Sequence, residues 1–305
     1  MTWKPKITLE TLQAKAALLK IIRNFFESKN ILEVQTPLIC DYSVTDPYIE
    51  SIETSCGFLQ TSPEYAMKKL LALHKTSIYQ ICKAFRDEEN GRWHNQEFTM
   101  LEWYIVDANM FDLIDQVCKL IENIFLGLEI FRCSYQDIFL KYTSIDPFKV
   151  SAADAFNYLN ENNKLPMGID NSLDLDDYLQ IIMSEIIEPS MDKQQAIIIY
   201  DYPQGQSALA KLAKRGYGIV AERFELYING IECGNGFHEL QDPEEQLSRF
   251  KENKSKREKL RLKSIDIDPD FMQALEYGLP NCSGIAIGLD RILMLKESIG
   301  HIEKV

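Results

Sequence analysis

A hairpin near residue 230 limits the fold of this chain more than any other stretch. The segment "RFELYINGIECGNGFHEL" has alternating apolar residues around an Asn-Gly pair at 229–230, the strongest short-range signal for a two-residue β-turn. That turn pairs Tyr227 with Glu232. Because side chains alternate along a strand, Glu225 and Glu232 are expected on one face. Since neighbouring carboxylates repel unless a cation separates them, this face is either a Mg²⁺ site completed by phosphate oxygens or an exposed acidic surface.

A second predicted strand pair flanks a polar loop. The runs "SIYQICKAFR" and "EFTMLEWYIV" surround "DEENGRWHNQ", which predicts an antiparallel pair with a long connection. Alternation places Phe98, Met100, Glu102 and Tyr104 on one face. Burying Glu102 among aromatic neighbours is costly unless a cation meets it. The face is therefore either a floor that stacks a base and binds an amine, or a half-buried sheet whose edge glutamate pairs with a lysine.

The rest of the chain alternates helices with short strands. Apolar residues recur at helical spacing over 8–29 and 109–128. Residues 30–39 read as a short strand that Pro37 forces to an edge or an end. The segment from about 140 to 190 is helical and acidic and shows no chemistry, while "AIIIYDYP" is a buried strand and "SGIAIGLDRILML" a strand followed by a helix. With no internal repeat, strands in an antiparallel sheet flanked by helices predict an α+β fold.

Length and composition narrow the class of protein. With 305 residues, 46% of them hydrophobic, the chain can bury one large core or two smaller ones. It has no run of about 18 apolar residues that would span a membrane, and no signal peptide at its N-terminus. Seven cysteines without a CxxC pair favour a reducing cytoplasm. The net charge of −13 argues against a general nucleic-acid binder.

Basic residues gather at a few positions. From Arg249 to Lys263, eight of fifteen residues are basic, so this run is either a solvated helix face or a docking patch for an acidic partner. Arg86, at the end of a predicted strand, either grips a phosphate with both guanidinium nitrogens or pairs with a nearby glutamate. The four histidines lack metal-ligand spacing, so zinc is not expected. Neither a Walker loop nor GxGxxG is present.

In combination these segments resemble the class II aminoacyl-tRNA synthetases. "FRDEE…HNQEFTMLEWY" is similar to motif 2 and "GIAIGLDRILML" to motif 3, and the stretch ending "EVQTPLI" is similar to motif 1, which builds the dimer interface in that class. "TSPEYAMKKLLA" and "IECGNGFHEL" resemble the lysyl branch. The resemblance covers nearly the whole chain. It implies a class II catalytic domain over residues 1–305, with a helical insertion at about 140–190, and a homodimer.

Lysyl-tRNA synthetases carry an anticodon-binding domain before motif 1, whereas motif 1 begins here almost at residue 8. This difference, with "SVTDPYIES" and "AERFELYINGIE", makes the chain similar to the lysyl-tRNA synthetase paralogues that modify elongation factor P. The resemblance implies a cytoplasmic, ATP-dependent ligase that activates (R)-β-lysine as an adenylate and transfers it to a lysine of elongation factor P, without tRNA or membrane. The alternatives are a truncated lysyl-tRNA synthetase that charges tRNA and an inactive synthetase-like binding module.

The resemblance also implies roles for single residues. The adenine would lie between Phe98 and Arg291, and the catalytic arginines, which stabilise charge on the α-phosphate, would be Arg86 and Arg291. Mg²⁺ would be held by Glu225 and Glu232. ATP contacts are expected from Arg86, Asp87, Glu88, Asn95, Phe98, Glu225, Leu226, Gly288 and Arg291. The amino-acid pocket would be lined by Ser62, Pro63, Glu64, Glu102, Tyr104, Glu232, Asn235, Glu239 and Ala286, the last standing where tRNA-charging lysyl enzymes have glycine.

Three features depart from the family pattern. Asp87 stands where the family usually has Asn, and Gln96 stands where it usually has Pro, so the motif 2 loop is expected to be set differently. The sequence ends at "HIEKV", a few residues short of the usual last strand, which is expected to weaken the last packing layer. No chemical group named above is lost.

Overall fold

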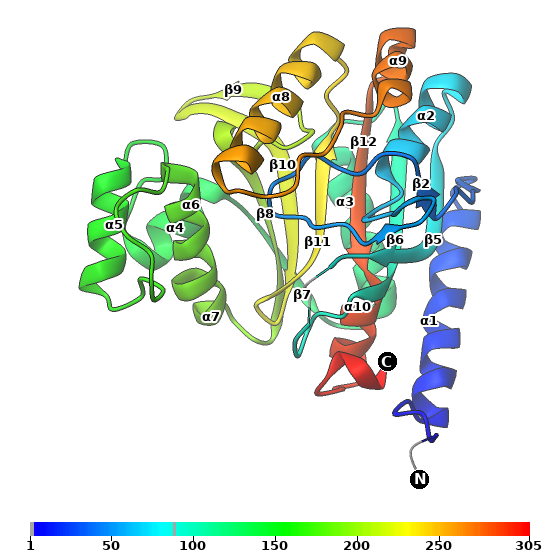
Figure 1. Cartoon of the computed structure of the whole chain (residues 1–305). Coiled ribbons are helices and arrows are strands. Elements are labelled where there is room, and N and C mark those ends of the chain that lie inside the picture. The colour runs from blue at the N-terminus through cyan, green and yellow to red at the C-terminus, as the bar shows by residue number, and fades with distance from the viewer. Residues whose placement is uncertain (1–2, 88–89) are drawn as a thin grey trace. The chain divides into compact units, whose positions relative to one another are not determined.

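The computed structural model describes residues 3–87 and 90–305, and the chain divides into two compact units (Figure 1). Unit 1 comprises Met1–Leu126 and Glu239–Val305, and unit 2 comprises Gly127–His238. Motif-like segments 1, 2 and 3 therefore belong to unit 1, whereas the Asn-Gly hairpin belongs to unit 2. That residues 1–305 act as one catalytic domain stays a prediction.

Unit 1 is built around a sheet whose central strands are antiparallel. Strand β5 (Ile78–Phe85) pairs antiparallel with β6 (Glu97–Val106), and β6 pairs antiparallel with β12 (Cys282–Gly288). The short β1 (Leu32–Glu33) lies parallel to β5 at the end of the strand order, so the edge position expected close to Pro37 is confirmed. The predicted pairing across the motif 2 loop is also confirmed. Because β6 has a partner on each side, it is an interior strand whose side chains project to the two faces of the sheet.

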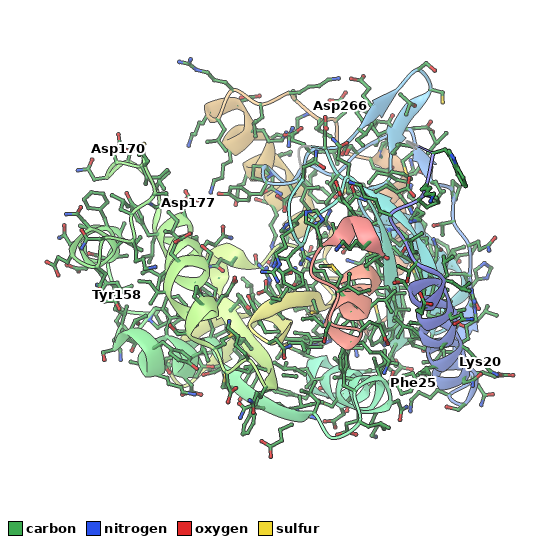
Figure 2. The ribbon with its side chains drawn as sticks, turned by 90° about the horizontal axis from the view of Figure 1, so that it is seen from below. Lys20, Phe25, Tyr158, Asp170, Asp177 and Asp266 are labelled. Atoms are coloured by element: carbon green, nitrogen blue, oxygen red, sulfur yellow. The ribbon has the colours of Figure 1, made fainter. Side chains whose placement is uncertain are left out.

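Two groups of helices belong to unit 1. Helix α1 (Leu9–Glu27) packs against α3 (Met110–Ile124) and α10 (Leu289–Lys296). Figure 2 shows Lys20 on the exposed face of α1, whereas Phe25 lies on its buried face. The second group consists of α2 (Glu64–His74), α8 (Pro243–Lys259) and α9 (Pro269–Gly278). A small sheet of β2 (Ile39–Cys40), β4 (Gly57–Leu59) and β3 (Glu53–Thr54) and the 3₁₀ turn Ile302–Lys304 complete the unit.

Unit 2 contains a run of paired strands. Strand β8 (Gln195–Pro203) lies between β7 (Glu129–Ser134), which is parallel to it, and β10 (Gly218–Ile228), which is antiparallel. Strand β10 also pairs with β9 (Leu212–Arg215) and with β11 (Ile231–His238). The Asn-Gly turn is confirmed: both residues have positive φ, 54° and 72°, as a type I′ turn requires. The predicted partners Tyr227 and Glu232 are confirmed as well.

The helices of unit 2 cover the segment that the sequence predicts to be helical, and its role as an insertion stays a prediction. They are α4 (Tyr135–Thr143), α5 (Ala152–Glu161), α6 (Leu175–Ile182), a π-helical turn (Met183–Ile187) and α7 (Glu188–Ser190), and a 3₁₀ turn covers Gln204–Gln206. Acidic residues of this segment begin the helices. Asp174 accepts a hydrogen bond from the backbone of Asp177 at 2.9 Å, which satisfies a free N–H of the first turn. Figure 2 labels Asp177 and, in the preceding turn, Asp170. Much of the acidity that the sequence shows here thus serves the helix starts.

The basic run from Arg249 to Lys263 lies mainly on α8, and its residues differ in role. Arg257 is 0% exposed and donates to the backbone oxygens of Asp46 and Lys263, each at 2.8 Å, and to Glu50 at 2.8 Å. It is therefore a structural residue that fastens the loop before β3. Arg257 is therefore not part of a solvated helix face, so that interpretation of the basic run is wrong at this residue. A docking role for the exposed lysines of the run stays a prediction.

The α+β class with a mainly antiparallel sheet and flanking helices is confirmed. Within residues 3–87 and 90–305, no helix is both long and apolar enough to cross a membrane.

Candidate active site

Unit 1 gathers three glutamates and one lysine, which we call the carboxylate cluster: Glu64, Lys68, Glu102 and Glu239. Glu64 opens α2, and Lys68 lies one turn later on the same helix face. Glu102 comes from the middle of β6. Glu239 is fixed to β12 by its backbone N–H, which donates to the oxygen of Cys282 at 3.0 Å. Three separate segments of the sequence therefore meet at one point.

Lys68 is the cation at the centre of the carboxylate cluster. Its Nζ lies 2.6 Å from Glu64 Oε1 and 2.6 Å from Glu239 Oε2. The Tyr104 hydroxyl donates to Glu102 Oε1 at 2.6 Å. Lys68, Glu102 and Glu239 are each only 1% exposed. One ammonium thus contacts two of the three carboxylates, and the third accepts from a tyrosine hydroxyl.

The cluster is short of positive charge and of hydrogen-bond donors. Among the described residues, Oε2 of Glu102 and Oε1 of Glu239 are buried without a hydrogen-bond partner. Burial, aided by the charge of Glu64, raises the pKa of Glu102 to about 8. Burial also raises the pKa of Glu239 to about 8, despite the attraction of Lys68. Unpartnered buried carboxylates are expensive, so the arrangement is suited to a ligand that brings ammonium groups.

This geometry decides between the two sequence interpretations of Glu102. It does not lie at an edge, because β6 has strands on both sides. It also forms no ion pair with a lysine within the described residues: its closest donor is Tyr104. The interpretation as an edge glutamate in a salt bridge is therefore wrong, and the amine-binding interpretation remains.

Strand β12 forms the neighbouring floor. Ala286 is paired with Glu102 and Gly284 with Tyr104, so these residues project to the same face of the sheet. A Cβ atom at Gly284 would overlap the Tyr104 ring and lie 2.9 Å from Glu239 Oε1. Glycine is thus required there for close packing, whereas the half-buried methyl of Ala286 lies beside the position of Glu102.

Ser62 and Pro63 begin α2 and thereby orient Glu64. Pro63 occupies the N-cap position, and the backbone N–H of Glu64 donates to Ser62 Oγ at 3.1 Å. Ser62 and Glu64 also line a cavity of about 360 Å³ whose other walls include residues 35–37 and 39–44, Asp268 and Asp270. Both predicted pocket residues therefore border a hollow next to the carboxylate cluster.

The residues of unit 1 that are predicted to bind ATP lie on β6, at the end of β12, on α10 and just after β5. The Arg86 guanidinium lies over the Phe98 ring, 5.3 Å from its centroid, a distance at which the cation attracts the ring face. Arg291 donates from Nε to the backbone oxygen of Trp93 at 3.1 Å. Gly288 ends β12 and is the N-cap of α10. In the ligand-free protein the predicted Phe98 stacking face is therefore covered by Arg86.

Asp290 fixes the helix that carries Arg291. Its Oδ2 accepts from the backbone N–H of Thr99 at 2.7 Å, and its Oδ1 accepts from Lys15 at 3.0 Å. These contacts tie the first turn of α10 to β6 and α1. They hold the Arg291 backbone in place, a positioning role that the sequence interpretation missed.

The two unusual residues of the motif 2 loop pair with each other. Gln96 donates from Nε2 to Asp87 Oδ1 at 2.9 Å, and its backbone oxygen accepts from Arg86 N at 2.9 Å. A proline at position 96 could not make the side-chain contact. The two departures therefore act as one substitution pair. Asn95 lies half-buried in this loop, and Glu88 lies outside the described residues.

Unit 2 presents a second acidic site, which we call the hairpin cavity. Glu225 and Glu232 line one cavity of about 210 Å³. A bulge in β11 shifts the register between Leu226 and Tyr227 and preserves the shared face. Asn235 pairs with Glu225 across the strands. Leu226 is fully buried and projects to the opposite face, so only its backbone can meet a ligand bound beside Glu225.

The sequence interpretation missed the groups that hold Glu225. The hydroxyls of Tyr202 and Tyr227 each donate to Glu225 Oε2 at 2.6 Å, and Arg223 donates to Oε1. Burial by itself lowers the pKa of Arg223, but the charge of Glu225 outweighs this effect and raises it. Tyr227 is two residues from Glu225, so alternation could have revealed it, whereas Tyr202 lies on another strand.

The helical insertion also contributes to the hairpin cavity. Gln180, Met183 and Glu188 line it, and Tyr227 donates to Glu188 Oε1 at 3.3 Å. The sequence showed no chemistry in this segment, whereas the structure places three of its side chains in the wall of the cavity. Met183 belongs to the π-helical turn, and such turns often occur at functional sites.

The carboxylates of the hairpin cavity suit a Mg²⁺ ion whose coordination is completed by phosphate oxygens. They are less suited to a metal ion that is bound by protein side chains alone. The described residues contain no group of three or more histidine, cysteine, aspartate or glutamate side chains arranged to hold a metal. Glu225 and Glu232 supply carboxylate oxygens to one hollow, and an ionised carboxylate can accept about four hydrogen bonds or metal contacts. Mg²⁺ is usually bound by one or two carboxylates plus substrate phosphates and water. The residues present fit that pattern.

Comparison with known proteins agrees with these features. The model of the family described as tRNA synthetases class II (D, K and N) matches residues 2–305. The elongation factor P–(R)-β-lysine ligase of Haemophilus ducreyi is 38% identical over 315 residues, which cover 100% of this chain and 95% of that protein. The Vibrio atlanticus ligase is 40% identical over 314 residues, 100% and 97% of the two chains. The Buchnera aphidicola ligase is 39% identical over 315 residues, 99% and 96%.

We predict that Glu102→Gln stabilises the ligand-free protein at alkaline pH. The folded protein holds a proton on Glu102 up to a pKa of about 8, against an ordinary value of 4.5. A carboxyl with a raised folded pKa makes stability fall as pH rises between those two values. The variant removes this loss, so its free energy of unfolding at pH 8 should exceed that of the wild type by about 1–3 kcal/mol.

Urea unfolding at pH 5, 6, 7 and 8 measures this difference. Glu97→Gln is the control, since Glu97 lies on the same strand and is exposed. Parallel stability curves for the wild type and Glu102→Gln would contradict a protonated, buried Glu102.

Proposed function

Since the chain belongs to the class II tRNA synthetase family (D, K and N), we propose that it activates (R)-β-lysine with ATP and transfers the aminoacyl group to a lysine of elongation factor P. The observation that carries this proposal is the carboxylate cluster. Its three glutamates, two of them buried, have one resident ammonium among them, and its unpartnered oxygens accept what a diammonium amino acid donates.

Activation is a displacement at the α-phosphate. The carboxylate of β-lysine attacks the α-phosphorus in line, a mixed anhydride with AMP forms, and pyrophosphate leaves. Negative charge grows on the phosphoryl oxygens, and Arg86 and Arg291 stabilise it. Before ATP binds, Arg86 covers the Phe98 ring, so we propose that the adenine takes its place against that ring while Arg86 turns toward phosphate.

The hairpin cavity would hold the metal that accompanies ATP. We propose Glu225 and Glu232 as the ligands of Mg²⁺, which neutralises phosphate charge when it is bound. Tyr202, Tyr227 and Arg223 fix the Glu225 carboxylate in one orientation. A carboxylate oriented in advance loses little freedom on binding a ligand. The proposal requires both the carboxylate cluster and the hairpin cavity.

Transfer consumes the activated amino acid. The ε-amine of the acceptor lysine, in its neutral form, attacks the anhydride carbonyl. An amide bond forms, AMP leaves, and the amine loses a proton. The protein acts by binding and orientation, and no side chain becomes covalently attached.

The enzyme is proposed to be a cytoplasmic homodimer. All seven cysteines are free thiols, which suits a reducing compartment. The motif 1 region exposes large apolar side chains at Leu9, Leu12, Leu32, Leu38 and Ile39. Exposed apolar groups on neighbouring elements are typical of protein–protein contacts, so this region would form the interface between two copies.

The proposed function is tested by ATP–pyrophosphate exchange with (R)-β-lysine and with α-lysine, followed by intact-mass analysis of elongation factor P. We expect exchange with β-lysine in the absence of tRNA, and a mass increase of one β-lysyl group on one lysine of the factor. Exchange that leads to charged tRNA instead would favour a truncated lysyl-tRNA synthetase. Absence of exchange with either isomer would favour a binding module.

We predict that Glu225→Gln or Glu232→Gln lowers exchange at least about 100-fold while the fold persists. Each change removes a charged ligand of the proposed metal site without altering side-chain volume. Far-ultraviolet dichroism and thermal unfolding monitor the fold. Glu185→Gln is the matched control, because Glu185 is an exposed acid of the helical insertion. Normal exchange in the doubly substituted enzyme would refute the metal role.

We predict that Ala286→Gly raises activation of α-lysine relative to β-lysine by at least about tenfold. Ala286 is paired with Glu102 on the amine-binding face. A β-amino acid carries its amine one carbon further from the carboxylate, so a methyl that crowds the α-amine position leaves β-lysine untouched. The measurement is the ratio of the two kcat/KM values in pyrophosphate exchange. A ratio equal to that of the wild type would place selectivity elsewhere.

A further inference from the structure

Lys68 is a resident cation in a pocket that is proposed to bind cations. A pocket for a diammonium substrate would gain nothing from a third ammonium that merely competed for its carboxylates. Yet Lys68 is 1% exposed and touches two of the three glutamates at 2.6 Å. Such a buried charge is costly, so its presence calls for a physical reason.

Charge balance supplies that reason. Three ionised glutamates and one ammonium leave two negative charges in the carboxylate cluster. (R)-β-lysine brings two ammonium groups, which would neutralise the cluster completely. Without Lys68 the same substrate would leave one negative charge buried and uncompensated, or would require one glutamate to stay protonated.

Position supports the same conclusion. Lys68 reaches back one helical turn to Glu64 and across to Glu239, so it fixes carboxylates that come from different segments. Burial by itself lowers the pKa of Lys68, but the charges of Glu239 and Glu64 outweigh this and raise it, so the side chain stays charged. The groups facing it are thus the glutamates of the cluster, with the Tyr104 hydroxyl on Glu102.

We infer that Lys68 is a positioning residue of the amino-acid pocket, which holds Glu64 and Glu239 in place and limits the pocket to the two negative charges that a diammonium substrate neutralises. This inference rests on the proposed function. It assigns specificity for doubly charged substrates to a residue that need not touch the substrate. A consequence is that binding exchanges protons for ammonium groups: Glu102 and Glu239 release protons when β-lysine binds near neutral pH.

Three substitutions separate charge from packing. Lys68→Gln keeps hydrogen-bond donors and loses the charge, Lys68→Met loses both, and Lys68→Arg keeps the charge. The control is Lys119→Gln, because Lys119 is an exposed lysine on α3 and lines neither of the two cavities described above.

Calorimetric titration with (R)-β-lysine in two buffers of different ionisation enthalpy counts the protons released, and pyrophosphate exchange gives kcat and KM between pH 6 and 9. For Lys68→Gln we expect KM for β-lysine to rise at least about tenfold with kcat within about threefold, the pattern of lost substrate binding. The pH at which affinity rises should shift upward, because loss of the Lys68 charge removes an attraction that favours the ionised glutamates. Lys68→Arg should lie closer to the wild type, and Lys119→Gln should match it.

Two results would overturn the inference. The first is a folded Lys68→Gln whose KM and pH profile equal those of the wild type. The second, which needs no variant and therefore holds even if the variants fail to fold, is a wild-type KM for a β-amino acid that lacks the ε-ammonium equal to the KM for β-lysine. If the wild type neither binds nor activates β-lysine, the proposed function itself fails, and this outcome is distinct from the other two.

Discussion

The burial of negative charge beside too little positive charge is the constraint on which the site in unit 1 depends. Glu102 and Glu239 lie almost fully buried with one unpartnered oxygen each among the described residues, and burial raises their pKa values to about 8. Burying these carboxylates lowers the stability of the folded protein, and such destabilising arrangements usually serve a function. Binding of ammonium groups would recover it, because each new contact replaces a proton or fills a missing hydrogen bond.

The two acidic sites handle their charge in opposite ways. In unit 2 both oxygens of Glu225 accept hydrogen bonds, from two tyrosines and from Arg223. This carboxylate is fixed before any ligand arrives, as suits a group that must present its charge to a metal. In unit 1 the carboxylate cluster keeps unsatisfied oxygens, as suits a pocket that recognises a ligand by completing it. Under the proposed function, the first site is preorganised and the second is completed by its ligand.

The two residues of the motif 2 loop that depart from the family pattern contact each other. Asp87 and Gln96 each depart from the usual residue, and together they form a hydrogen bond of 2.9 Å. The backbone of Arg86 is held in the same place by the oxygen of Gln96. The loop thus keeps its anchor beside the proposed nucleotide site through a side-chain pair, where the family usually relies on the rigidity of proline.

The sequence by itself determined the strands, the Asn-Gly turn, the shared face of Glu225 and Glu232 and the face of Glu102 and Tyr104, because these follow from alternation and turn chemistry within a few residues. Tertiary structure alone decided that Lys68 meets Glu239, that Tyr202 holds Glu225 and that Glu188 of the insertion lines the same cavity. Local rules do not reach residues that folding brings from distant segments. The pKa values depend further on burial and on neighbouring charge, which exist only once the chain has folded.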